Sequence, residues 1–144
     1  MFTAAPTMTF GRPPHIAQAY RNMAAETGIA DASPHRLVTM LFDGFLEAVA
    51  EARGAMRAND VERKGRAIVR AVRIVEEGLR GGLNLKAGGT LAADLDSLYG
   101  YVGMRLTQAN LKNSEAALDE CQRLLQPLRD AWMTIASPAG RHDA

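Results

Sequence analysis

The side chains that most often carry out chemistry are few in this sequence and widely spaced. The three histidines, His15, His35 and His142, fall near the N-terminus, at the start of a helical pattern and near the C-terminus. A metal site in a helical bundle needs Glu-x-x-His pairs and further carboxylates that project into the core. The sequence contains no Glu-x-x-His. We therefore expect no metal site, and we expect each histidine to be solvated.

The sequence also predicts no catalytic nucleophile and no phosphate-binding loop. The single cysteine, Cys121, lies in a helical pattern that predicts a buried thiol in a reducing compartment. A nucleophile would need a nearby histidine base, and the positions of the histidines offer none. The glycines in GLRGGLNLKAGGT lack the spacing of a P-loop and the strand before it, so they indicate helix ends and a turn. We expect no enzymatic activity and no cofactor.

The composition predicts one domain with its own core. At 144 residues with 47% hydrophobic content, the chain can bury a core without disulfides or a metal. Lysine and arginine number 17 against 16 aspartate and glutamate, a net charge of +1. No overall field therefore favours nucleic acid or an anionic membrane.

The one local charge feature is a row of basic residues between positions 63 and 80. Its members are Arg63, Lys64, Arg66, Arg70, Arg73 and Arg80. Nucleic-acid binding would use such a stripe, but acidic residues interleave it and supply helical partners, as in Glu62 with Arg66 and Arg73 with Glu77. We favour a solvated, salt-bridged face and expect no nucleic-acid partner.

No segment resembles a targeting or membrane-spanning sequence. The stretch MFTAAPTMTFGRPPH has no basic region ahead of an apolar run of roughly 7–15 residues. Nowhere does an apolar run approach the roughly 20 residues that a membrane span requires. We expect a cytoplasmic protein with no stable membrane insertion.

Residues 1–31 differ in composition from the rest of the chain. Prolines and glycine interrupt regular structure there, and only HIAQAYRNMAAE is suited to a short helix. Within it Ile16, Tyr20 and Met23 recur at helical spacing and form one apolar stripe. We interpret this segment as a mobile N-terminal arm, with a possible short extra helix, that can dock on the body.

Residues 32–136 show helical periodicity throughout. Ser33 is a good N-cap and Pro34 suits the first helical position, so a first helix should run from there to about Asn59. Asp60 opens a second helix, whose main stripe comprises Val61, Gly65, Ile68, Val72, Val75 and Leu79. The glycines at positions 78, 81 and 82 should loosen or end it, because each weakens a helix by about 1 kcal/mol relative to alanine.

Two more helices complete the pattern. Thr90 is the expected N-cap of the third, and the stretch NLKNS should separate it from a fourth that reaches Ile135. The fold class is therefore all-α, an antiparallel four-helix bundle, followed by a disordered tail at 137–144. Tyr99, Tyr101 and Leu106 make the third helix apolar on more than one side. This predicts either a groove for a partner helix or a thicker core, and the residues alone favour neither.

Several motifs together resemble the FliS family, the flagellin-specific export chaperones of bacteria. They are Tyr20, DASPHRLVTMLFDGF, NDVERKGRAIVRAVRIVEEGL, LDSLYGYVGMRLTQANLKN and LRDAW, in this order and with the family's separations. The resemblance runs from Tyr20 to Trp132. It implies a mostly antiparallel four-helix bundle, in agreement with the periodicity.

The resemblance also implies a function. Such a protein binds the disordered C-terminal segment of flagellin in the bacterial cytosol, prevents premature polymerisation and assists delivery to the flagellar type III export apparatus. The alternative is a helical-bundle adaptor for another flagellar export client or a regulator. An exposed groove would also permit a homodimer when the client is absent.

The family's pattern falls on Tyr20, Ser33, Pro34, Tyr99, Tyr101, Arg105 and Asn110. We expect Ile16 and Tyr20 to form the docking arm. The full set of expected partner-binding residues is Ile16, Tyr20, Ile68, Val72, Val75, Tyr99, Tyr101, Val102, Arg105, Leu106 and Asn110. We expect Ser33, Pro34, Asp43 and Trp132 to be structural, and Asn110 to have a structural role as well.

Overall fold

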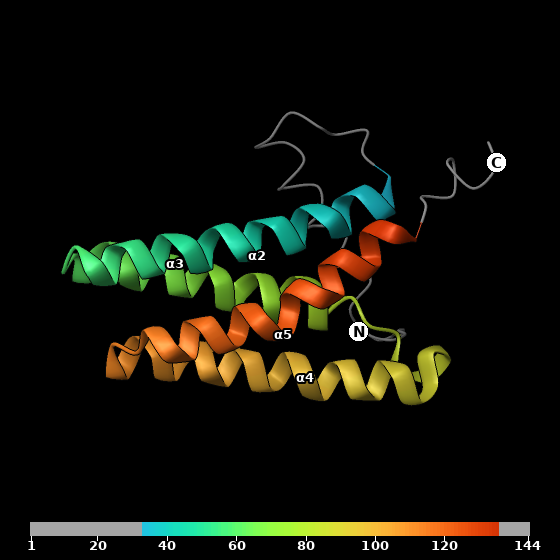
Figure 1. Ribbon diagram of the computed structural model, residues 1–144. Coiled ribbons are helices and arrows are strands. Elements are labelled where there is room, and N and C mark those ends of the chain that lie inside the picture. The colour runs from blue at the N-terminus through green and yellow to red at the C-terminus, as the bar shows by residue number, and fades with distance from the viewer. Residues whose placement is uncertain (1–32, 136–144) are drawn as a thin grey trace, which may run out of the picture.

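The computed structural model describes residues 33–135, and the expected arm and tail lie outside this range. Four helical rods form an all-α bundle, and residues 33–135 contain no strand (Figure 1). The elements are α2 (Pro34–Arg57), α3 (Val61–Arg73), η2 (Ile74–Arg80), α4 (Leu85–Lys112) and α5 (Glu115–Thr134). Since η2 continues α3 directly, the two make one rod. The predicted four-helix bundle is confirmed.

Local side chains begin the first two helices where the sequence predicts. Ser33 Oγ accepts a hydrogen bond from the backbone N–H of Arg36 at 3.1 Å, with Pro34 in the first turn of α2. Asp60 Oδ1 accepts one from the N–H of Arg63 at 3.1 Å and caps α3. Both caps satisfy N–H groups that have no partner within the helix.

The second rod loosens before it ends. From Ile74 to Arg80 it is a π-helix, whose wider turn is rare and marks a departure from regular packing. The loosening predicted near Gly78 is confirmed, and it begins four residues earlier. Gly78 packs directly on α2, because a Cβ at this position would lie 2.8 Å from Leu41 Cδ2.

The start of α4 differs from the prediction. Asn84 Oδ1 accepts a hydrogen bond from the N–H of Ala87 at 3.0 Å, so the helix begins with a turn ahead of Thr90. Gly89 then breaks the helical path with φ 57° and ψ −139°. Asn84 thus caps a short first turn, and the longer part of α4 follows the break at Gly89. The expectation that Thr90 is the N-cap is wrong, because Thr90 is already helical and the residue before it makes the break.

The predicted separation between the last two helices is confirmed. Asn113 ends α4 in the left-handed conformation, with φ 54°, and Ser114 Oγ caps α5 by accepting from the N–H of Ala117 at 3.1 Å. Lys64 of α3, only 7% exposed, donates to the carbonyl of Asn110 and the side chain of Asn113. A cation at these last carbonyls also matches the negative end of the helix dipole.

The core lies between the four rods and is apolar. Its most fully buried large side chains are Phe45, Val49, Ile68, Val75, Val102, Leu106, Leu118, Cys121 and Leu125. Outside this core, ion pairs join α2 to α5: Arg53 with Asp119 at 2.9 Å and Arg129 with Asp43 at 2.9 Å. In Figure 1, α5 lies beside α4 near their shared turn and then rises toward the start of α2.

The start of α2 and the end of α5 are held by one histidine–tryptophan pair. The rings of His35 and Trp132 stack with centroids 4.8 Å apart. Trp132 Nε1 donates to the His35 carbonyl at 3.1 Å, and His35 Nε2 lies 3.1 Å from the Trp132 carbonyl. His35 is half-buried, so the expectation that it is solvated is wrong, because α5 covers it.

Candidate functional site

The described residues hold neither a reactive thiol nor a metal-binding cluster. Cys121 is buried, and this burial raises the pKa of its thiol to about 12, which keeps it protonated and unreactive. Within residues 33–135, no three side chains of histidine, cysteine, aspartate or glutamate are grouped so as to hold a metal ion.

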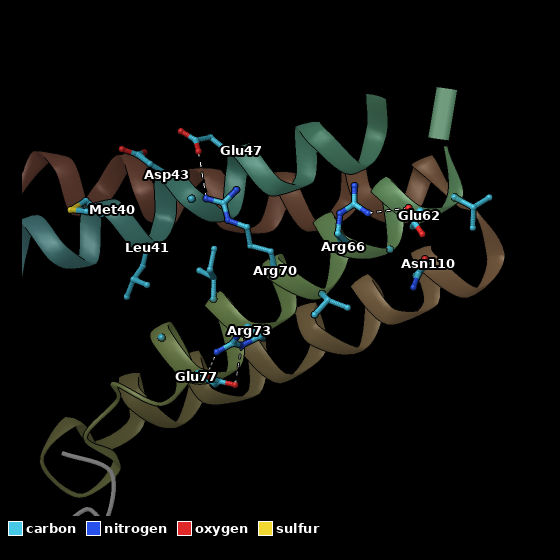
Figure 2. Close-up of a pocket in the computed structure, with 16 residues that line it drawn as sticks. Met40, Leu41, Asp43, Glu47, Glu62, Arg66, Arg70, Arg73, Glu77 and Asn110 are labelled. Carbon is cyan, nitrogen blue, oxygen red and sulfur yellow. Dashed lines mark hydrogen bonds and ion pairs between the residues drawn. The ribbon is translucent and has the colours of Figure 1, made fainter. Parts of the chain in front are cut away.

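A groove of about 1090 Å³ runs between α2 and the rod formed by α3 and η2. Its apolar lining comes from both sides and includes Met40, Leu41, Gly44, Val61, Gly65, Val69 and Ile74. Figure 2 shows Leu41 pointing toward the α3–η2 rod. An apolar groove between two helices is the usual shape of a site for a third helix.

Charged side chains form the rim of this groove. Arg70 of α3 reaches across to Glu47 of α2 at 3.6 Å, as Figure 2 shows. Along the rod, Arg66 pairs with Glu62 at 3.4 Å, and Arg73 Nε lies 3.5 Å from a Glu77 carboxylate oxygen. The predicted pairing of Glu62 with Arg66 and of Arg73 with Glu77 is confirmed.

Large apolar side chains remain exposed on α3 and on the neighbouring α4. Val61 is 72% and Val69 55% exposed on α3, and Leu111 is 82% exposed on α4, where Met104 is also exposed. Leu111 follows Asn110, whose carbonyl binds Lys64 of α3, so both helices meet at this end of the bundle. We call Val61, Val69, Met104 and Leu111 the exposed apolar set. Val61 and Val69 of this set also line the groove, and exposed apolar side chains at a groove are typical of interaction sites.

The opposite side of α4 carries a hydrogen-bonded network with α5. Tyr101 Oη donates to one carboxylate oxygen of Glu120 at 2.6 Å, and Arg105 Nε donates to the other at 2.6 Å. The bond to Glu120 raises the pKa of Tyr101, and the bonds from Tyr101 and then Arg105 lower the pKa of Glu120. Tyr101 and Arg105 thus join α4 to α5.

Several predicted partner-binding residues lie inside the bundle. The side chains that the structure buries are those of Ile68, Val75, Tyr99, Val102 and Leu106. Ile68, Val75, Val102 and Leu106 fill inward positions of α3, η2 and α4, and their expected contact with a partner stays a prediction. Burial also raises the pKa of Tyr99 to about 12.

The other predicted residues have different positions. Val72 is half-buried on α3, Tyr101 is 37% exposed, and Asn110 lines the groove. Ile16 and Tyr20 lie outside the described residues. Contact between a partner and any of the predicted residues stays a prediction.

The exposed apolar set was missed by reasoning from the sequence. Val61 and Gly65 were assigned to the inward stripe of the second helix, yet Val61 is exposed and Gly65 is half-exposed. The available signal was the spacing of Val61, Gly65 and Val69, which step by four and so share a face beside the buried stripe.

Comparison with known proteins decides the family. The family model described as "Flagellar protein FliS" matches residues 16–139. The chain belongs to the FliS family. A relative from Salmonella typhimurium named flagellar secretion chaperone FliS is 40% identical over 122 residues, which cover 85% of this chain and 90% of the relative.

Two further FliS relatives agree in extent. The flagellar secretion chaperone FliSB of Pseudomonas aeruginosa is 42% identical over 117 residues, covering 81% of this chain and 92% of that protein. FliS of Escherichia coli strain K12 is 39% identical over 123 residues, covering 85% and 90% respectively. The resemblance to the FliS family is thus confirmed over most of the length.

Proposed function

We propose that this protein is a cytoplasmic export chaperone that binds the disordered C-terminal segment of flagellin. It prevents premature polymerisation and assists delivery to the flagellar type III export apparatus. The observation that carries the proposal is the exposed apolar set beside the groove, on a bundle that belongs to the FliS family. The names of its relatives, flagellar secretion chaperones, support the same role.

The geometry suits a partner that folds as it binds. A disordered segment loses conformational entropy when it becomes helical, so it needs a wide apolar surface to compensate. The groove and the exposed apolar set together offer such a surface around α3. Binding of this kind needs neither catalysis nor a cofactor, and the proposed protein is not an enzyme.

The N-terminal arm has a part in the proposal. Ile16 and Tyr20 form the stripe by which the arm covers apolar surface when flagellin is absent. The same surface would join two copies as a homodimer in the absence of the client.

Among residues 33–135, no helix combines the length and the apolar character that crossing a membrane demands.

Calorimetric titration with the C-terminal segment of the same organism's flagellin tests the proposal. We expect saturable one-to-one binding with a negative change in heat capacity, the mark of apolar burial. The double variant Val69→Asp, Met104→Asp should weaken binding by at least about tenfold, since each charge would be desolvated in the interface. Met133→Asp, at an exposed apolar position on α5, is the matched control and should bind normally.

The result of this titration also distinguishes a flagellin chaperone from the alternative, an adaptor for another client. If the intact protein binds no flagellin segment, the proposal fails, and an adaptor for another flagellar export client or a regulator becomes the better hypothesis. Circular dichroism of each variant establishes that the helices are intact, so that lost binding is not lost folding.

A further inference from the structure

Gly65 lies within α3, and none of residues 33–135 requires a glycine there. A Cβ added at this position would meet no heavy atom of residues 33–135 within 4 Å, and the residue has the conformation of an ordinary helix. Alanine at such a position stabilises a helix relative to glycine. Gly65 therefore weakens the free protein and leaves a notch on its surface.

The notch has apolar walls. Val61 and Val69 lie one turn before and one turn after Gly65 on the same face of α3. All three line the groove, and both valines are more than half exposed. A gap between side chains on a helix surface is where a packed partner helix inserts a side chain of its own.

A row of arginines borders the notch. Arg66, Arg70 and Arg73 step by four and three along α3 and line the groove, as Figure 2 shows. Each side chain is more than half exposed, and each lies 3.4–3.6 Å from its acidic partner. Exposed pairs of this kind contribute little to stability, so these arginines can exchange partners at small cost.

The acidic residues that line the groove are divided between its two walls. Asp43 and Glu47 lie one turn apart on α2, Glu62 lies in the first turn of α3, and Glu77 lies in η2. Arg129 of α5 already pairs with Asp43 at 2.9 Å, so the acidic wall offers a shorter row than the arginines do. The arginine row has three members, and its spacing is that of one edge of a helix.

We infer that the groove receives a client helix that inserts a large apolar side chain at Gly65 and places acidic residues, spaced by four and three, along Arg66, Arg70 and Arg73. This inference rests on the proposed function and names the chemistry of the bound helix. The notch sets how closely the helix approaches. The arginine row sets which edge of the client helix lies along α3, because the opposite wall carries Asp43 and Glu47 of α2 and would repel an acidic edge.

The first test is Gly65→Ala in the full chain, titrated with the flagellin C-terminal segment. We expect the midpoint of thermal unfolding to rise, because alanine favours the helix. We also expect the dissociation constant to increase by about tenfold, because the added methyl group fills the notch. Gly54→Ala is the matched control. Gly54 is also a helical glycine, it does not line the groove, and its added Cβ meets only the end of Arg63 at 3.0 Å.

The second test uses two synthetic amphipathic peptides with the same leucine face. One carries glutamate and the other lysine, at i, i+4 and i+7 along one edge. We expect the glutamate peptide to bind at least about tenfold more tightly at low salt, and the preference to shrink as salt is raised. It should reverse in the triple variant Arg66→Glu, Arg70→Glu, Arg73→Glu.

The outcomes separate this inference from the proposed function. Tight binding of the flagellin segment that Gly65→Ala leaves unchanged would overturn the notch while the proposed function stands. Equal affinity for the two peptides would overturn the arginine row. If the flagellin segment does not bind but the glutamate peptide does, with loss in Gly65→Ala, the inference holds and the choice of flagellin as client fails.

Discussion

At the scale of single residues, Glu120 is the centre of the contact between α4 and α5. Its two carboxylate oxygens accept hydrogen bonds from Tyr101 and Arg105, each at 2.6 Å. Tyr101 and Arg105 were expected to contact a partner, and here they bind across the bundle. Any partner that recruits them must compete with this carboxylate.

Replacing Glu120 by glutamine should lower the pKa of Tyr101 toward its ordinary value of 10. The reason is that the carboxylate accepts a hydrogen bond from the protonated phenol and so opposes its ionisation. Absorbance of the tyrosinate during a pH titration measures it, and Tyr101→Phe identifies the step that belongs to Tyr101. An unchanged pKa in Glu120→Gln would contradict the hydrogen bond.

The same network predicts how stability depends on acid. The pKa of Glu120 is lowered in the folded protein from a reference of 4.5, so ionised Glu120 stabilises the folded state fully only above pH 4.5. That contribution is lost as the pH falls below 4.5 and through the folded pKa. Glu120→Gln should remove this part of the acid sensitivity, which chemical denaturation of both proteins at a series of pH values measures.

At the scale of helices, the π-helix η2 is fitted to its neighbours by glycines. Gly78 brings η2 against Leu41 of α2. On the other side Gly103 of α4 leaves room for Glu76, since a Cβ there would lie 2.6 Å from the carboxylate. Arg80 of η2 also pairs with Asp96 of α4 at 2.8 Å. The wide turn is thus held from two sides.

Gly78→Ala should lower the free energy of unfolding by about 1–3 kcal/mol, because the methyl group would overlap the buried Leu41 side chain. Chemical denaturation followed by circular dichroism measures the loss. Gly54→Ala is the control, since its methyl group meets only a movable arginine end, and it should cost far less. Equal losses in both variants would refute tight packing at η2.

At the scale of the whole molecule, client binding should stabilise the bundle. At a concentration one hundred times the dissociation constant, a ligand that binds only the folded state adds about 2.7 kcal/mol. For a chain of this size, the midpoint of thermal unfolding should then rise by about 5–10 °C with the flagellin segment. Nucleotides and other small metabolites should produce no shift, and a shift with one of them alone would favour an enzyme.

The sequence predicted the outline of the molecule because much of it is decided locally. Ser33 and Asp60 cap helices through atoms three residues away, and Arg66 meets Glu62 within one turn. Helix number and the family were accessible in the same way, from periodicity and from motifs. Thr90 failed as a cap because the break falls at Gly89, one residue earlier, and Asn84 already caps a turn ahead of it.

Which side of each helix faces water was decided only by the tertiary structure. Periodicity defines an apolar stripe but not how far the neighbouring helices cover its edges, so Ile68 is buried while Val61, on the same predicted stripe, is exposed. The contacts of Tyr101 with Glu120 and of His35 with Trp132 join residues 19 and 97 positions apart. Such pairs depend on how the rods are placed side by side, and that placement is a property of the assembled core.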